Sequence, residues 1–193
     1  RVWGFLKYHH PAVASGRYNW DYELFRFLPG YLEAADTAAR DGLLIGWIDS
    51  LGEITPSESR VQVASQTCLE PDLSWIGRGM TPALARKLQY VYDNRNSGPN
   101  YYVRMIPQVG NPEFTNENDY GQMDCPDAGF RLLSLYRYWN MVQYFSPNRD
   151  IADKDWDTVL AEYIPVFVGA SSRLEYELAA LRLIGELHDT HAN

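Results

Sequence analysis

Apolar residues recur every three or four positions in two separated parts of the chain, the spacing that places them on one face of an α-helix. In the first part these are Leu24, Leu28 and Tyr31, followed by Ile45, Ile48 and Leu51. In the second part they are Leu160, Ile164 and Phe167, followed by Leu181, Ile184 and Leu187. We expect each set to form a buried helix face.

Residues that favour helix starts precede these stripes. Asn19 and Asp155 stand where a side chain can accept a hydrogen bond from the first free N–H groups of a helix, and Asp36 and Ser172 do the same one helix later. Ser172 and Glu175 also have the spacing of a capping box.

Prolines set further limits on these helices. A first helix, over 2–8 or 132–145, should end near Pro11 or Pro147. Pro29 and Pro165 fall inside the second helix of each part, where we expect a kink or a break.

The two parts also match each other in sequence. Residues 1–52 and 137–188 align without a gap at a constant offset of 136, with 11 identities, where unrelated segments would share roughly three. We therefore predict a mainly α fold, in which a duplicated three-helix unit (1–52 and 127–193) forms a helical bundle. An apolar helix start precedes the second copy but not Arg1, so we expect the chain to be part of a longer one.

Residues 53–126 should form a small mixed α/β insert between the copies. The segments 60–64 and 101–106 favour β structure and could pair. Thr81 and Pro82 open a helix with an apolar face of Leu84, Leu88 and Val91. The stretch 94–127 is rich in Asn, Gly, Pro and acidic residues, so it should be mostly loop.

Charge and hydropathy exclude some classes of function. With 25 acidic and 17 basic residues the net charge is −8, which disfavours nucleic-acid binding. No apolar run is long enough to span a membrane, and the chain shows no signal peptide. The spacing of Cys68 and Cys125 does not fit a zinc site; a disulfide and two separate thiols both remain open.

Four tryptophans lie at matched positions, and two of them precede an aspartate. Trp3 and Trp20 with Asp21, and Trp139 and Trp156 with Asp157, are predicted to be structural anchors of helix packing rather than a binding site. His9 and His10 occur in the first copy only, and we expect them to be partly exposed polar residues at a helix end.

The segment from Leu187 to Asn193 has the highest concentration of potentially reactive side chains. His188 and His191 are three residues apart, but a metal would need a third ligand, so we expect no metal and no cofactor. His191 is a candidate general base, with a capping or hydrogen-bonding role as the alternative. A phosphate loop, a nucleophile elbow and an S-x-x-K spacing are all missing, so we expect no complete active centre.

Two runs, V-W-G-F-L-K-Y-H-H-P from Val2 and N-W-D from Asn19, resemble the region ahead of the catalytic core in tail-specific (C-terminal processing) serine peptidases. The likeness is greatest to exported members of the Bacteroidetes type. F-R-L-L from Phe130, R-Y-W-N from Arg137, D-W from Asp155 and I-G-E-L-H-D-T-H from Ile184 extend it over most of the helical parts.

The resemblance implies a PDZ-like module and an α/β core with the nucleophilic serine further along the polypeptide. Those domains and a peptide or protein substrate would be the partners, and the location would be exported, periplasmic or outer-membrane-associated. In the related tricorn-type branch, a histidine in a Ser-His-Ala stretch of the helical cap completes the active site. Thr190-His191-Ala192 falls at the similar place with threonine for serine, so the resemblance implies a catalytic role for His191 in the intact enzyme.

The predicted function is therefore a non-catalytic cap or scaffold domain that positions the peptidase core and gates access of the substrate. A non-enzymatic helical-repeat module that binds a peptide or protein is the alternative. A metal-dependent hydrolase built on His188 and His191 ranks third, because it lacks ligands.

Overall fold

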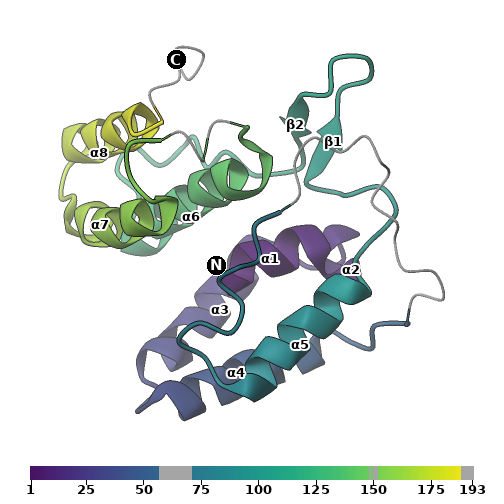
Figure 1. Cartoon of the computed structure of the whole chain (residues 1–193). Coiled ribbons are helices and arrows are strands. Elements are labelled where there is room, and N and C mark those ends of the chain that lie inside the picture. Colours follow the sequence, from purple (N-terminus) through teal and green to yellow (C-terminus); the bar gives the residue numbers. More distant parts are fainter. Residues whose placement is uncertain (57–70, 148, 150–151, 188–193) are drawn as a thin grey trace. The chain divides into compact units, whose positions relative to one another are not determined.

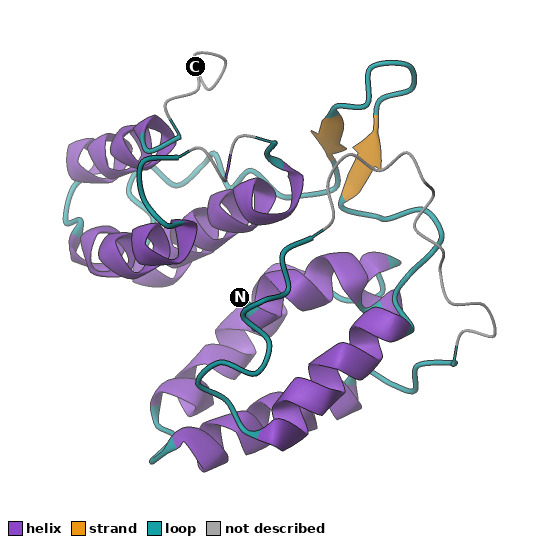
Figure 2. Ribbon diagram, in the orientation of Figure 1, coloured by secondary structure: helices purple, strands orange, loops and turns teal. Residues whose placement is uncertain are grey.

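The structure, a computed structural model, describes residues 1–56, 71–147, 149 and 152–187. This part of the chain is mainly α-helical, with eight α-helices and a single two-stranded sheet (Figures 1 and 2). The chain divides into two compact units, Arg1–Glu117 and Asn118–Asn193. None of the helices in the described ranges is long and apolar enough to cross a membrane.

The first unit contains five helices and both strands. Its elements are α1 (Val2–His9), α2 (Pro11–Ala14), α3 (Trp20–Leu32), α4 (Thr37–Ser50), α5 (Pro82–Asp93), β1 (Val103–Met105) and β2 (Pro112–Phe114). Helix α5 packs against α1 and α4, and the described elements of the 53–126 segment belong to this unit.

The second unit is built from three helices. They are α6 (Ala128–Phe145), α7 (Trp156–Gly169) and α8 (Arg173–Gly185), with α7 packed between α6 and α8. Its core joins aromatic and aliphatic side chains of all three helices, among them Trp139, Phe167 and Leu183.

The predicted helix starts are confirmed. Asn19 accepts a hydrogen bond from the N–H of Tyr22, and Asp155 accepts one from that of Thr158. The corresponding acceptors for α4, α5 and α8 are Asp36, Thr81 and Ser172. These boundaries were predictable because a cap depends on only three or four consecutive residues.

The predicted capping box of Ser172 and Glu175 forms with one different partner. The Glu175 carboxylate accepts hydrogen bonds from the N–H and hydroxyl of Ser171, at 2.7 and 2.9 Å. The reciprocal bond is therefore made with the serine that precedes the cap residue. Hydrogen bonds to the charged form lower the pKa of the Glu175 carboxyl, so this group is ionised at neutral pH.

A break at the helix prolines was the wrong expectation. Helix α3 continues through Pro29, and α7 continues through Pro165. Both prolines are exposed, so water can satisfy the carbonyl group that loses its helix bond.

The predicted buried faces are only partly correct. Leu24, Ile48, Leu51 and Leu187 are buried, but Leu181 is 64% exposed. Helix α8 instead buries Ala179 and Leu183, and α7 buries Val159, Tyr163 and Phe167. These residues recur every four positions, so each buried face lies to one side of the stripe expected from the sequence.

In the insert, α5 has the predicted start and the predicted buried face of Leu84, Leu88 and Val91. β1 lies within the expected segment 101–106 and pairs antiparallel with β2. The segment 60–64, proposed as its partner, lies outside the described residues.

Gly16 fixes the approach of this insert to α2. It has φ +77°, and a Cβ at this position would lie 2.5 Å from the ring of Tyr101. The N–H of Tyr101 also donates to the carbonyl oxygen of Ala14, at 2.7 Å. Only glycine fits such a backbone conformation and such a close ring.

Each unit contains a pair of tryptophans in which the indole N–H of each residue donates a hydrogen bond to the backbone carbonyl of the other. The indole N–H of Trp3 donates to the carbonyl oxygen of Trp20 at 2.9 Å, and that of Trp20 donates to Trp3 at 2.9 Å. In the second unit, Trp139 donates to Trp156 at 2.7 Å and Trp156 donates to Trp139 at 3.0 Å. All four side chains are buried, so each pair clamps two helices together.

Further rings extend the first pair. The ring of Trp20 stacks with those of Trp3 and Trp47, with centroid distances of 6.4 and 4.9 Å. The ring of Phe27 stacks on Trp47 at 4.3 Å. Helices α1, α3 and α4 therefore meet in one column of aromatic rings.

Replacing one tryptophan of a pair should destabilise the unit that contains it. Trp20→Phe and Trp156→Phe each remove ring volume and one buried hydrogen bond to a helix carbonyl oxygen, at a cost of about 2 kcal/mol or more. Hydrogen exchange of the amides in each unit measures this loss. Tyr22→Phe, on the exposed side of α3, is the control and should be almost neutral. A neutral Trp20→Phe or Trp156→Phe would show that the reciprocal bonds do not hold the unit.

Candidate functional site

The sequence-derived catalytic candidate, His191, lies outside the described residues, as do His188 and Asp189. Within the described part of the chain, no group of three or more His, Cys, Asp or Glu side chains is placed to hold a metal ion. Cys125 is exposed, whereas Cys68, its candidate disulfide partner, is outside the described ranges.

The two tryptophan–aspartate positions are parts of helix junctions. Asp21 is buried and Asp157 is half-buried, and both lie in the first turn of their helix. A carboxylate in this position is stabilised by the free N–H groups of the helix start. Their position beside the clamped tryptophans agrees with an anchoring role.

His9 is half-buried at the end of α1, as expected for a partly exposed residue, whereas His10 differs from that expectation. His10 is only 1% exposed, and neither of its ring nitrogens has a hydrogen-bond partner among the described residues. Burial, together with the nearby charges of Lys87 and Arg17, lowers the pKa of His10 to about 4. His10 is therefore a neutral imidazole at physiological pH.

His9 is held between two aromatic rings. The Phe5 and Tyr92 ring centroids lie 4.9 and 5.3 Å from that of the imidazole. Burial, and then the charge of Arg95, lowers the pKa of His9 to about 3. The sequence could not predict this environment, because Tyr92, near the end of α5, and Arg95, just beyond α5, are distant from His9 along the chain.

Lys7 is a buried cation in an aromatic surround. It is 1% exposed, and its ammonium group lies 4.9 to 5.5 Å from the ring centroids of Trp3, Tyr8 and Tyr102. The same group forms an ion pair with Glu117, the last residue of the first unit. These partners favour a charged ammonium, so Lys7 is placed as a structural cation rather than as a nucleophile or base.

Arg131 performs a similar task in the second unit. Its guanidinium group is buried and donates to the carbonyl oxygens of Phe167 and Val168, at 2.7 and 2.9 Å, and to that of Pro126. Three donors of one side chain thus satisfy the end of α7 and hold it to the start of α6.

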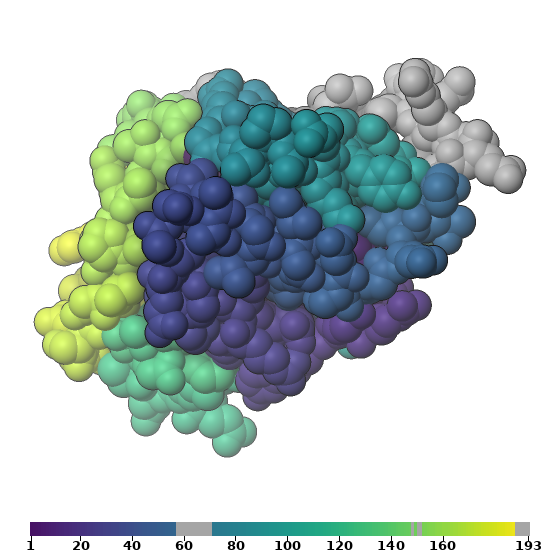
Figure 3. Space-filling view, turned by 90° about the horizontal axis from the view of Figure 1, so that it is seen from below, coloured from purple at the N-terminus to yellow at the C-terminus, as the bar shows by residue number. Residues whose placement is uncertain are grey.

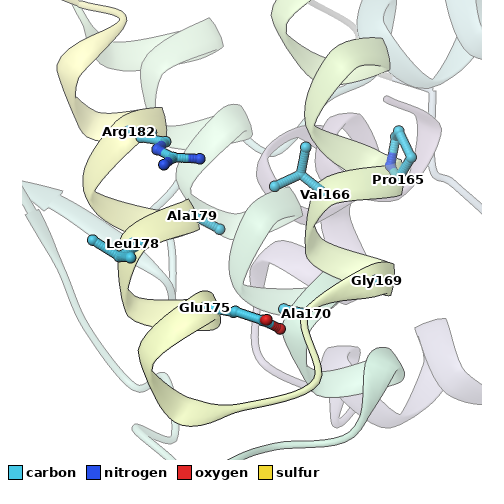
Figure 4. A pocket seen from close by; sticks show the side chains of 8 residues that line it. All are labelled: Pro165, Val166, Gly169, Ala170, Glu175, Leu178, Ala179 and Arg182. Atoms are coloured by element: carbon cyan, nitrogen blue, oxygen red, sulfur yellow. The ribbon is translucent and has the colours of Figure 1, made fainter.

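The second unit also has an open groove between α7 and α8, with a volume of about 370 Å³. Pro165, Val166 and Gly169 line the α7 side, and Glu175, Ala179 and Arg182 are among the residues on the α8 side. Figure 4 shows the Glu175 and Arg182 side chains directed toward α7, with Leu178 directed to the other side of α8. Apart from one charged residue of each sign, Glu175 and Arg182, the residues that line the groove have apolar side chains or none.

Beside this groove, α8 exposes three leucines. Leu174 and Leu181 are each 64% exposed and Leu178 is 40% exposed. Figure 3 shows α8, in yellow, at the surface. Sequence reasoning missed this stripe because it assigned Leu181 to the core, although the spacing of the three leucines was readable as one helix face.

The described residues therefore present paired tryptophans that anchor the helices, two buried cations (Lys7 and Arg131), two neutral histidines (His9 and His10) and an open groove. Comparison with protein-family models, curated proteins and solved structures finds no match for this chain.

Acidification should destabilise the first unit through His10. In the unfolded chain this imidazole gains a proton below about pH 6.5, whereas in the folded unit it does so only near pH 4. Stability should therefore fall as the pH drops between these values, by about 3 kcal/mol from His10 alone. Hydrogen exchange of the α1 amides measures this change.

His10→Gln is the matched variant, because it keeps a polar side chain that does not titrate in this range. Its stability should depend less steeply on pH than that of the unaltered chain. An equal pH dependence of the two proteins would contradict a buried neutral His10.

Proposed function

We propose that this chain is the N-terminal, non-catalytic helical domain of an exported serine-type peptidase of the tail-specific (C-terminal processing) family. Its work is mechanical: it packs against the catalytic core and limits access of the peptide substrate. The observation that carries the proposal is that the aromatic residues of the family resemblance, Trp3, Trp20, Trp139 and Trp156, are the buried anchors of interlocked helix pairs. The same residues that suggest the family thus supply rigidity, which a scaffold domain requires.

We further propose that the two units descend from one duplicated three-helix bundle. Both tryptophan pairs have the same separation in sequence and the same reciprocal hydrogen bonds. The helix caps also recur at the constant offset, with Asn19 matching Asp155 and Asp36 matching Ser172. The insert between the copies adds α5 and the hairpin to the first one.

In this proposal the reaction is hydrolysis of a peptide bond by a serine in a downstream α/β core, in an exported, periplasmic or outer-membrane-associated protein. His191 would contribute a general base from the cap. The PDZ-like and catalytic domains and a peptide substrate are the proposed partners.

A second candidate function is a non-enzymatic module that binds a peptide or protein. The observation that favours it is the groove between α7 and α8 beside the exposed leucines. An amphipathic segment that fits this surface would be held by burial of apolar area. The proposed scaffold ranks first because the resemblance covers both units.

The isolated chain should not hydrolyse peptides, since the nucleophilic serine would lie in another domain. A peptidase assay with unstructured protein substrates tests this, and turnover by the pure chain would contradict the scaffold role. In the intact reading frame, a PDZ-like stretch followed by a serine at a strand-to-helix turn would support the peptidase. A further copy of the tryptophan–proline–tryptophan–aspartate pattern would support the binding module.

In the intact enzyme, His191→Ala should reduce kcat by about 100-fold if the imidazole is a general base. The pH dependence of kcat/KM should lose the limb that reports this group. His188→Ala, a nearby histidine outside the threonine–histidine–alanine stretch, is the matched control. Unchanged kinetics of His191→Ala would make that residue structural.

A further inference from the structure

The outer face of α8 exposes a row of leucines that the described residues of its own unit leave uncovered. Leu174, Leu178 and Leu181 lie one turn apart along this face, and all three are exposed. Gly185 continues the stripe, and a Cβ there would meet nothing within 4 Å. An exposed apolar row of this length on a helix marks a surface for contact with another element.

In the first unit, helix α5 packs along one side of α4. Asp41 accepts a hydrogen bond from the N–H of Thr81 at the start of α5, and Asp49 forms an ion pair with Lys87 of α5. At the constant offset, Leu174, Leu178 and Leu181 match Ala38, Gly42 and Ile45. Ala38 and Gly42 are exposed and Ile45 is half-buried. In the duplication proposed above, the row of three exposed leucines therefore belongs to the second copy alone.

The charged residues beside the leucine stripe indicate what kind of helix can pack on it. Glu175 and Arg182 lie on the same flank of α8, both directed toward the groove (Figure 4). They are seven residues apart, or about 10 Å along the helix. Arg182 has no ion-pair partner among the described residues, and Glu175 is ionised. On the opposite flank, Arg173 and Glu177 already pair with each other at 2.7 Å.

A second copy of α8, packed antiparallel and related by a two-fold axis near Leu178, provides partners for the leucines and for both charges. The two-fold rotation reverses the helix direction but keeps the flanks with Glu175 and Arg182 on the same side of the interface. Arg182 of one copy therefore faces Glu175 of the other. The same contact occurs a second time at the other end. The leucines of the two stripes then cover each other, as a self-complementary isologous interface requires.

We propose that α8 is a homodimer interface, in which two copies of the chain pack their Leu174, Leu178 and Leu181 stripes antiparallel and exchange Arg182–Glu175 ion pairs. The interface is small, so the dimer is weak and depends on protein concentration.

Sedimentation velocity of the chain over a concentration series tests the proposal, with a reducing agent present because Cys125 is exposed. The mass should rise from that of one chain, 22.2 kDa, toward twice that value. Leu178→Asp should weaken association at least about tenfold, since it places a charge at the centre of the apolar contact. Leu181→Asp, at a more exposed position, is a second variant, and circular dichroism checks that each variant keeps its helices.

Leu32→Asp is the matched control, because Leu32 is an exposed leucine, 72% accessible, on α3 of the other unit. It should leave association unchanged. Arg182→Glu should weaken the dimer, and the double variant Arg182→Glu with Glu175→Arg should restore it, because both ion pairs return with reversed charges.

A chain that stays monomeric up to about 1 mM would overturn the proposal. A dimer that survives both leucine variants, or one that the double charge reversal fails to restore, would overturn it equally. These measurements need no peptidase core, so a failed scaffold proposal and a failed dimer proposal give separate results.

Discussion

The reciprocal bonds between paired tryptophans are the constraint on which both units depend. A buried indole needs an acceptor for its N–H group, and here each indole finds it in the backbone of its partner. The two bonds fix both the distance and the rotation of the joined helices. Packing alone would allow the helices to slide, whereas a pair of directional bonds allows one register.

With the helix pairs fixed, each unit closes its remaining surface differently. In the first, α5 covers α4, and the insert is tied to α1 through Lys7 and Glu117. In the second, Arg131 satisfies the end of α7, and α8 keeps an apolar outer face. In the duplication proposed above, the difference between the units thus lies in what surrounds the paired helices. The proposed dimer interface therefore rests on the open surface of the second unit rather than on a cluster of reactive groups.

The sequence predicted the parts of the fold that depend on neighbours along the chain. Caps such as Asn19, Thr81 and Asp155 are local, so their helix starts were correct. The burial of His10 and the exposure of Leu181 were not predicted, because both depend on elements that are distant in sequence. For the same reason, the contacts of Lys7 with aromatic rings were not predicted from the sequence. The histidine suggested by the family resemblance stays a prediction.

The column of rings in the first unit has an optical consequence. Trp20 and Trp47 are stacked with planes only 3° apart, and the planes of Trp3 and Trp20 differ by 13°. Indoles held so close and so nearly parallel share their electronic excitation. Their coupled transitions should add an exciton band to the far-ultraviolet circular dichroism, on top of the helix signal. Loosening of α1, α3 and α4 would therefore be visible in solution before any helix unwinds.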